Sequence, residues 1–484
     1  MATTVAAKPV RAATRTTETT AAKPMPAAPR IKDPDALFRR LGAFVKAEMK
    51  RLHVPGVAVG VVHEGREYTA GFGVTSVENP LPVDADTLFQ IGSTTKTFTG
   101  SAAMRLVERG RLDLDAPLRI YLPKLRLAGR GVAGRLTLRH LFNHTGGWVG
   151  DHFVDTGWGD DALAEAVGRM AEIEQLTPLG EVWSYNNAGF YLAGRAVEVA
   201  AGKPYEAAIR ELILDPLGMD RSFFFPGDLM TYRFAVGHTV VDDQPRVARP
   251  WPLSRALNPV GGLASTVKDQ LKYARFQSGD GTGPDGKRLL QRESMAEMQR
   301  PAVYAGSGAW RGVTWSIKDV GGVKTVRHGG GTNGQLSAFV LAPQQGFAIT
   351  VLTNANRGGE LHDGAVRWAL RRYLGVEDRN PAPLELAEAA LRPYVGRYTT
   401  PMSDIELTLR DGGLIAQVTP KGGFPDKDSA PGPTPPPTRL VLTADDGILT
   451  LDPPFKDGRG EFLRDPDGKI AWLRFGGRIA RRQG

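Results

Sequence analysis

The chain has 484 residues, of which 41% are hydrophobic and 23% are charged, and it contains no cysteine. This composition is typical of a folded protein of two or three domains, and it excludes disulfides, thiolate metal sites and a cysteine nucleophile. The formal net charge is +9, but residues 1–32 hold six basic residues against one acidic residue. More than half of the excess therefore lies in one tail, and we expect no nucleic-acid partner.

The tail, residues 1–34, is rich in alanine, threonine and proline and has no apolar run. Such a composition favours a disordered basic tail, and the absence of an apolar h-region argues against a secretory signal. No window of the chain approaches the roughly 20 apolar residues that a membrane span needs. The sequence therefore predicts a soluble, cytoplasmic protein without a membrane span.

The first half of residues 35–380 combines helical and strand patterns. Apolar residues at helical spacing predict a helix over Asp35–Leu52. Two strands, Val57–Val62 and Glu67–Phe72, are then predicted to form a hairpin. A mostly apolar, buried helix is predicted within Thr87–Gly110. A strand pair followed by a core helix is typical of an α+β domain.

The second half of this domain predicts a helical region and then more strands. Residues Leu136–Leu217 have helical patterns separated by loops. Strands are predicted over Gly322–Arg327, Leu336–Leu341 and Phe347–Leu352, followed by a helix through Asp363–Leu374. We therefore expect a sheet that draws its strands from both ends of the domain, with helices around it and a helical subdomain inserted.

The composition changes near Asn380, and residues 381–484 predict a small separate β domain. Short strand patterns alternate there with Asp-Gly turns, of which the first is Asp411-Gly412. The Pro- and Gly-rich stretch Pro420–Pro437 is predicted to be a mobile loop. The basic end of the chain is interpreted as a solvated rim, formed by Arg474, Arg478, Arg481 and Arg482.

Three patterns that could indicate other functions lack the required context. Residues 129–134 and 329–334 match G-x-G-x-x-G, but neither lies between a strand and a helix as dinucleotide binding requires. His140 and His144 are four residues apart, but Leu141 stands where a zincin has glutamate, so a structural histidine pair is favoured over a metal site. No serine lies in G-x-S-x-G.

The remaining signal is Ser93-Thr-Thr-Lys96 at the start of the predicted buried helix. Three residues along a helix make nearly one turn, so the Lys96 amine and the Ser93 hydroxyl are expected to face the same side. Lysine acts as a base only when it is neutral, and burial and neighbouring positive charge lower its pKa. The pattern predicts a nucleophile beside a base, although S-x-x-K alone also fits a helix start with a solvated lysine.

Two further motifs follow Ser93 and Lys96 along the chain. Tyr185-Asn-Asn187 forms a Y-x-N element before an apolar helix, and Arg327-His328-Gly-Gly-Gly331 ends a predicted strand. With Ser93 and Lys96 included, the chain resembles the serine β-lactamase and penicillin-binding-protein superfamily over roughly residues 35–375. The class C-like branch is the most similar, which includes family VIII carboxylesterases and D-aminopeptidases.

The resemblance implies an antiparallel sheet flanked by helices, with the active site between the sheet and the helical subdomain. It implies that Ser93 attacks an acyl carbonyl and forms an acyl-enzyme. Lys96 and Tyr185 would share the proton transfers. The implied reaction needs no metal and no organic cofactor.

The resemblance also assigns substrate-binding residues. Asn187 would hydrogen-bond both Lys96 and the substrate amide, and His328 would position Tyr185 or the acyl group. The backbone N–H groups of Ser93 and Gly331 would form the oxyanion hole, next to Gly330. The segment Leu391-Arg-Pro-Tyr-Val-Gly-Arg-Tyr398 resembles the lipocalin-like β domain, a small barrel, appended to some of these hydrolases.

One departure from the superfamily affects the expected substrate. His328-Gly329-Gly330 replaces the Lys-Thr-Gly of penicillin-recognising members, so the cation and hydroxyl that bind a β-lactam carboxylate are missing. Histidine is mostly uncharged at neutral pH. The sequence therefore predicts a serine hydrolase of carboxylic esters, amides or short peptides with weak or no turnover of penicillins.

Two alternatives stay open. The same acyl-enzyme could be passed to an amine or alcohol, as in an acyltransferase or peptide cyclase, because the choice depends on water access and acceptor binding. The chain could also be a catalytically silent binding protein of the same fold, although Ser93, Lys96 and Tyr185 are all present. The residues leave self-association into a homo-oligomer open.

Overall fold

The structure, a computed structural model, describes residues 31, 33–426 and 428–484. The predicted disordered tail therefore lies almost entirely outside the described residues. The first helix, α1 (Pro34–Leu52), begins at Asp33, whose side chain accepts a hydrogen bond from the Ala36 N–H at 2.8 Å. It ends at His53, which adopts a left-handed conformation.

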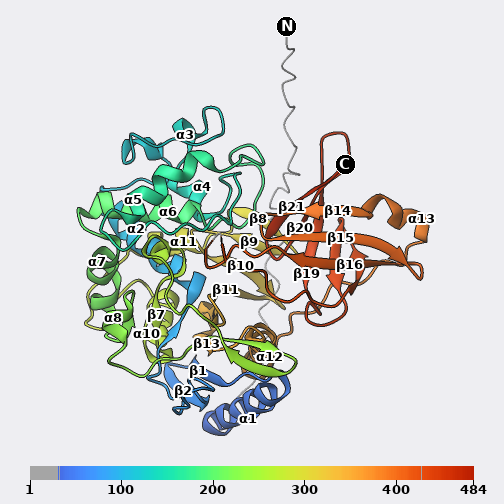
Figure 1. The fold of residues 1–484 in the computed structure, drawn as a ribbon. Helices are drawn as coiled ribbons and strands as arrows, with labels where there is room; N and C mark the ends of the chain where they lie inside the picture. The colour runs from blue at the N-terminus through green and yellow to red at the C-terminus, as the bar shows by residue number, and fades with distance from the viewer. Residues whose placement is uncertain (1–30, 32, 427) are drawn as a thin grey trace.

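An antiparallel eight-stranded sheet forms the centre of the larger domain (Figure 1). Its strands come from both ends of the domain, as predicted, because β1 pairs with β13. The sheet order is β2 (Arg66–Gly73), β1 (Gly56–His63), β13 (Phe347–Thr353), β12 (Leu336–Ala342), β11 (Val323–Gly331), β10 (Ser316–Val320), β9 (Ala309–Arg311) and β8 (Val303–Gly306). The sequence did not predict the last three strands of this list.

Helices cover both faces of this sheet. On one face, α1 and α12 (Gly358–Ala369) pack on the strands, and their apolar residues form one buried cluster. On the other face, α2 (Thr95–Glu108) and α10 (Val267–Ser278) belong to a second, larger cluster. That cluster continues into the helical region that the sequence predicted.

The helical region packs on α2 through α6 (Gly189–Ala201). The remaining helices are short: α3 (Val132–Arg135), α4 (Leu138–Phe142), α5 (Ala162–Gly168), α7 (Tyr205–Ile209), α8 (Pro226–Leu229), α9 (Asn258–Gly261), α11 (Arg292–Met298) and α13 (Glu388–Leu391). Small sheets join β3 (Phe89–Gln90), β7 (Ala264–Ser265) and β4 (Ser222–Phe223), and also β5 (His238–Val241) and β6 (Gln244–Val247). Within the described residues, no helix is both long and apolar enough to cross a membrane.

The C-terminal strands close into an eight-stranded barrel with its own buried cluster. The strands are β14 (Gly396–Thr399), β15 (Ser403–Arg410), β16 (Gly413–Pro420), β17 (Thr438–Thr443), β18 (Gly447–Thr450), β19 (Arg459–Arg464), β20 (Ile470–Phe475) and β21 (Arg478–Arg482). The predicted turn at Asp411-Gly412 joins β15 to β16, and both residues have positive φ, at 52° and 75°.

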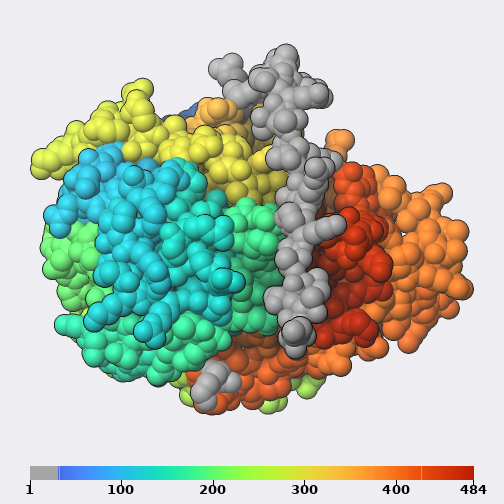
Figure 2. Space-filling view, turned by 90° about the horizontal axis from the view of Figure 1, so that it is seen from above, coloured from blue at the N-terminus to red at the C-terminus, as the bar shows by residue number. Residues whose placement is uncertain are grey.

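The barrel lies against the larger domain. Figure 2 shows the barrel, in orange and red, beside the helical region, in cyan and green. The β20–β21 hairpin, residues 470–482, makes hydrogen bonds to the segment 183–187 of the helical region. The barrel is thus in direct contact with the segment that carries Tyr185.

Candidate active site

Ser93 lies in a 3₁₀ turn, Gly92–Thr94, immediately before α2. The prediction that placed it in the helix itself was wrong by two residues, because α2 begins at Thr95. The turn still brings the expected groups together. The Lys96 Nζ donates to Ser93 Oγ at 3.0 Å and to the Val260 carbonyl oxygen at 2.6 Å.

Lys96 is completely buried. Burial lowers the pKa of the Lys96 amine well below its usual value, and the positive charge of Arg478 lowers it further, whereas Asp151 opposes this shift. No hydrogen bond or ion pair joins the amine to a carboxylate of the described residues. The structure therefore favours the neutral amine, which is the form that can accept a proton.

Tyr185 lies beside both groups. The Lys96 Nζ is 5.2 Å from the centre of the Tyr185 ring, and the Ser93 hydroxyl is near enough to lower the pKa of the Tyr185 phenol. Burial raises the pKa of the Tyr185 phenol, although Ser93, Arg478 and Arg311 partly offset this effect. The raised pKa favours the protonated phenol near neutral pH, and the predicted sharing of proton transfers between Lys96 and Tyr185 stays a prediction.

The end of β11 lies directly on the backbone of the Ser93 turn. A side chain at Gly330 would place its Cβ 1.9 Å from the Ile91 carbonyl oxygen and 2.7 Å from the Ser93 nitrogen. A Cβ at Gly92, where φ is +52°, would lie 2.5 Å from the Gly331 nitrogen. Only glycine allows this approach, which brings the N–H groups of Ser93 and Gly331 close together.

His328 precedes these glycines and is buried. Its Nδ1 donates to the Gly329 carbonyl oxygen at 2.6 Å, and its Nε2 has no partner. Burial and then the nearby Lys96 lower the pKa of His328 to about 3. The residue is therefore neutral, and its ring centre lies 6.4 Å from that of Tyr185 without a hydrogen bond between them.

Asn187 makes no hydrogen bond with Lys96, in contrast to the prediction. Its Nδ2 donates instead to Asp151 Oδ1 at 2.7 Å, and its own Oδ1 has no partner. Asp151 also forms a two-pronged ion pair with Arg478, at 2.8 Å and 3.2 Å. Burial alone would raise the pKa of the Asp151 carboxyl, but Arg478 and Asn187 lower it below its usual value.

The barrel hairpin supplies Arg478, which pairs with Asp151 although its own side chain is 38% exposed. The predicted solvated rim was wrong for Arg474, which is buried. The Arg478 guanidinium lies 4.8 Å from the centre of the Tyr185 ring, and the neighbouring Gly477 carbonyl oxygen accepts a hydrogen bond from the Tyr185 N–H at 2.8 Å. Arg474 is buried and donates to the Trp183 carbonyl oxygen at 2.8 Å. Sequence reasoning missed both contacts, because no local pattern marks them.

The two histidines of the helical region have different surroundings. His140 completes a capping box with Thr137 at the start of α4, which is the structural role that the sequence favoured. His144 lies against Tyr185, with ring centres 4.5 Å apart, and its Nδ1 accepts a hydrogen bond from the Asn186 N–H at 3.0 Å. Among the described residues, no group of three or more metal-ligating side chains could hold a metal ion.

Ser93 opens into a cleft of about 1840 Å³ between the larger domain and the barrel. Apolar side chains of both parts line it, including Phe153, Leu257 and Met402. The stretch 420–437, predicted to be a mobile loop, contributes to the wall, and Phe424 packs edge-on against Phe153 at 5.0 Å. The barrel is therefore part of the candidate site.

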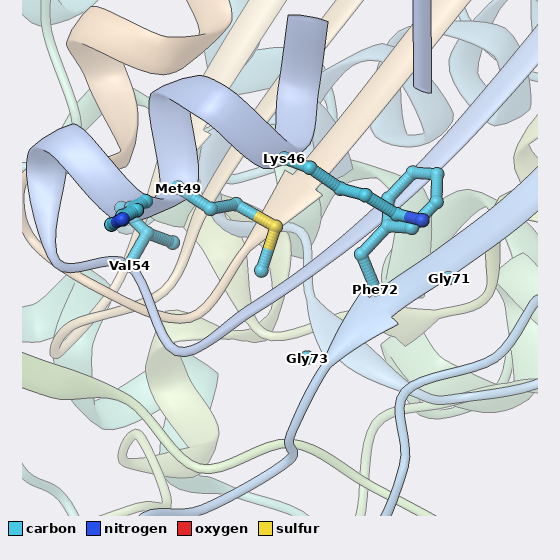
Figure 3. A pocket seen from close by; sticks show the side chains of 7 residues that line it. Lys46, Met49, Val54, Gly71, Phe72 and Gly73 are labelled. Atoms are coloured by element: carbon cyan, nitrogen blue, oxygen red, sulfur yellow. The ribbon is translucent and has the colours of Figure 1, made fainter. Parts of the chain in front are cut away.

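A second pocket, of about 550 Å³, lies between α1 and β2 (Figure 3). The Lys46 ammonium lies over the Phe72 ring at 5.1 Å, and the Met49 thioether lies beside them. None of the side chains that line this pocket carries a hydroxyl or a carboxyl group.

The fold and the grouping of Ser93, Lys96 and Tyr185 define a β-lactamase-like protein with an appended barrel. A profile of the Beta-lactamase family matches residues 41–372. The chain belongs to this family.

Individual relatives extend the comparison. "Penicillin-binding protein 4" of Amycolatopsis lactamdurans is 33% identical over 361 residues, covering 72% of this chain and 93% of that protein. "Unguisins hydrolase ungD'" of Aspergillus campestris is 27% identical and covers 66% of this chain and 62% of its own length. The crystal structure of SurE superposes with a TM-score of 0.71 at 25% identity, covering 93% of this chain and 99% of that one.

Proposed function

We propose that the protein is a serine hydrolase that works through a Ser93 acyl-enzyme on carboxylic esters, amides or short peptides. The observation that carries the proposal is the contact of a fully buried lysine amine with the Ser93 hydroxyl, at 3.0 Å. A buried amine without a carboxylate partner is poised to be neutral. An activated hydroxyl beside a base is the arrangement that nucleophilic catalysis needs.

The reaction follows from the positions of these groups. Lys96 takes the proton of Ser93 as the serine oxygen attacks the acyl carbonyl. The N–H groups of Ser93 and Gly331 stabilise the negative charge on the carbonyl oxygen, an interaction worth about 3–4 kcal/mol per donor. Tyr185, protonated and beside Ser93, donates its proton to the leaving group and regains one from the Lys96 ammonium, which restores both groups. Lys96 then takes a proton from water as the water oxygen attacks the acyl-enzyme, and that proton returns to Ser93 as the acid is released.

The substrate preference rests on β11. His328, neutral and buried, and Gly329 stand where penicillin-recognising members have lysine and threonine, so these two positions offer no cation to a β-lactam carboxylate. We therefore propose that penicillins are turned over weakly or not at all. Asn187, held by Asp151, is proposed to contact the substrate amide through its free Oδ1.

The first experiment combines active-site labelling with hydrolysis of aryl esters. The intact protein is expected to react with a fluorophosphonate and to release p-nitrophenol from p-nitrophenyl butyrate, whereas the Ser93→Ala variant should do neither. A panel with a chromogenic cephalosporin and D- and L-aminoacyl anilides then ranks the substrate classes. A wild-type protein that is neither labelled nor active would contradict the proposal.

Acyl transfer is the second candidate, and the size of the cleft favours it. At about 1840 Å³, the cleft exceeds the roughly 300–1000 Å³ of ordinary small-molecule pockets, so it has room for an acyl donor and an acceptor together. Product analysis with an added amine separates the two reactions. A transferase should give aminolysis product well above the nonenzymatic level.

A further inference from the structure

Arg311, the last residue of β9, lines the cleft and has an unusual environment. Its guanidinium lies over the Trp183 ring, 4.5 Å from the ring centre. Within the part of the chain that the structure describes, this guanidinium makes no hydrogen bond or ion pair, and its Nε is buried without a partner. A largely buried cation without an acceptor is costly unless a ligand supplies one.

The other arginines of the cleft are paired with carboxylates. Arg357 bonds Asp243 at 2.6 Å, and Arg367 bonds Asp457 at 2.9 Å. The remaining pairs are Arg51 with Glu48 and Glu360, Arg478 with Asp151, and, at 3.9 Å, Arg327 with Asp378. Arg311 therefore differs from every other described arginine that lines this cleft.

Two further donors without acceptors lie near Arg311. The Trp183 Nε1 is buried and unpartnered. The His144 Nε2 is also unpartnered, and it carries the ring hydrogen because Nδ1 already accepts from the Asn186 N–H. The rings of His144 and Trp183 are 6.5 Å apart. Several unsatisfied donors in one region indicate a ligand that is rich in acceptors.

We propose that Arg311 is the carboxylate-binding residue of the cleft, and that substrates of Ser93 therefore carry a free carboxylate. A guanidinium fits a carboxylate with two parallel hydrogen bonds, and stacking on Trp183 fixes its plane. Burial without a counter-charge also lowers the pKa of Arg311 to about 10, which a bound carboxylate would reverse. The proposal rests on the proposed function and names its substrate class.

This position differs from the strand that carries His328. Arg311 is paired in register with Ser316, and Ser316 with Arg327, so Arg311 lies two strands away from β11. With strands about 4.8 Å apart, the Cα atoms of Arg311 and Arg327 are roughly 10 Å apart. The subsite is therefore separate from the place where a Lys-Thr-Gly motif would hold a carboxylate.

Isosteric substrate pairs test the proposal and locate the carboxylate. The first pair, p-nitrophenyl glutarate and its terminal amide, places the charge on the acyl group. The second pair, the butyrate esters of 3-hydroxybenzoate and 3-hydroxybenzamide, places it on the leaving group. The wild-type protein is expected to prefer the acid over the amide by at least about 10-fold in kcat/KM in one of the two pairs. No preference in either pair would overturn the proposal.

Variants assign any such preference to Arg311. Arg311→Gln should reduce the ratio of kcat/KM for the acid to kcat/KM for the amide to below 2-fold. Arg311→Lys should retain part of this preference for the acid. Arg357→Gln is the matched control, because it removes an arginine of the same cleft that is already paired, and the ratio should stay as in the wild type. If Arg311→Gln and Arg357→Gln both lose the preference for the acid, or if both keep it, a specific role for Arg311 is contradicted.

Equilibrium binding separates this proposal from the catalytic one. Calorimetric titration with phenylacetate and with phenylacetamide needs no turnover. The acid should bind the wild-type protein at least about 10-fold more tightly than the amide, and the Arg311→Gln variant should bind both alike. If the protein binds the acid more tightly than the amide but hydrolyses no ester, the carboxylate subsite is supported and the serine hydrolase proposal is rejected. If it hydrolyses esters but binds both probes equally, the serine hydrolase proposal is supported and the subsite is rejected.

Discussion

Two basic groups lie beside the Tyr185 ring and come from opposite ends of the chain. The Lys96 amine, at the start of α2, lies 5.2 Å from the ring centre, and the Arg478 guanidinium, on the barrel, lies 4.8 Å from it. Lys96 has no carboxylate partner, and burial lowers the pKa of its amine. Arg478 is paired with Asp151, which raises the pKa of the guanidinium although burial acts the other way.

The comparison shows how one site can contain a base and a permanent charge side by side. A carboxylate partner keeps Arg478 ionised, and the absence of one leaves Lys96 free to lose its proton. The fixed charge of Arg478 then favours the neutral form of Lys96. The barrel therefore acts on the proposed chemistry without contributing a reacting group.

The largest expected effect comes from removing the neutral amine. Lys96→Ala should lower kcat/KM for p-nitrophenyl butyrate by about 10²–10⁴-fold, because the amine that lies 3.0 Å from Ser93 Oγ is the proposed acceptor of the serine proton. Tyr185→Phe should lower kcat/KM less than Lys96→Ala does with an aryl ester, because p-nitrophenolate leaves without protonation. With an anilide, whose leaving group needs a proton, the loss in kcat/KM should be larger. Equal effects of Tyr185→Phe on ester and anilide would remove the phenol from leaving-group protonation.

The next effect is a pair of opposite pH shifts. Arg478→Gln removes a positive charge that lowers the Lys96 pKa, so that pKa should rise and the acidic limb of the kcat/KM profile should move to higher pH. Asp151→Asn removes a negative charge that raises it, so the same limb should move to lower pH. His144 and His328, which also face Lys96, are expected to be neutral and to contribute little.

The two profiles are measured with one ester from acidic to alkaline pH. On the acidic limb, where Lys96 is mostly protonated, a rise of one pKa unit in Arg478→Gln would lower kcat/KM by about 10-fold. Shifts in the same direction for both variants would show that the ion pair acts through structure and not through charge.

A smaller, structural effect is expected at the second buried arginine of the hairpin. Arg474 bonds the Trp183 carbonyl oxygen and pairs with Glu461, and both side chains are largely buried. Arg474→Gln leaves the Glu461 carboxylate without its partner and should lower the free energy of unfolding by about 3–5 kcal/mol. Urea denaturation followed by tryptophan fluorescence measures this loss, and an unchanged midpoint would contradict the contact.

Local patterns predicted the Lys96 side of the comparison but not the Arg478 side. Ser93 and Lys96 are three residues apart, so helical geometry alone brings them together, and the glycines of β11 mark the close approach of a strand. Asp151 and Arg478 are 327 positions apart, and neither lies in a motif. Their meeting depends on how the barrel docks, which composition and periodicity do not encode.

In the fold, too, some elements could be predicted from local patterns and others could not. The long strands of the sheet and the Asp-Gly turn at residue 411 were predictable, because an apolar pattern or a turn signal marks each one. Strands β8, β9 and β10 are only three to five residues long, too short for an alternating pattern to stand out, and Arg311 lies on one of them. Asn187 was assigned to Lys96 from the resemblance, but the Arg478–Asp151 pair holds it elsewhere.

The smallest effect is expected at Arg481, three residues from Arg478 on the same strand. Its ion pair with Glu174 also joins the barrel to the helical region, at 2.9 Å, but both side chains are about half exposed. Such surface pairs contribute about 0–1 kcal/mol. Arg481→Gln should therefore leave the pH profile and kcat/KM within about 2-fold of the wild type. The two arginine side chains are similarly exposed, at 46% and 38%, but Glu174, the partner of Arg481, lies in water, whereas Asp151, the partner of Arg478, is only 8% exposed. A shift as large as that of Arg478→Gln would mean that any charge on the hairpin acts on Lys96, and that the pairing with Asp151 is not what matters.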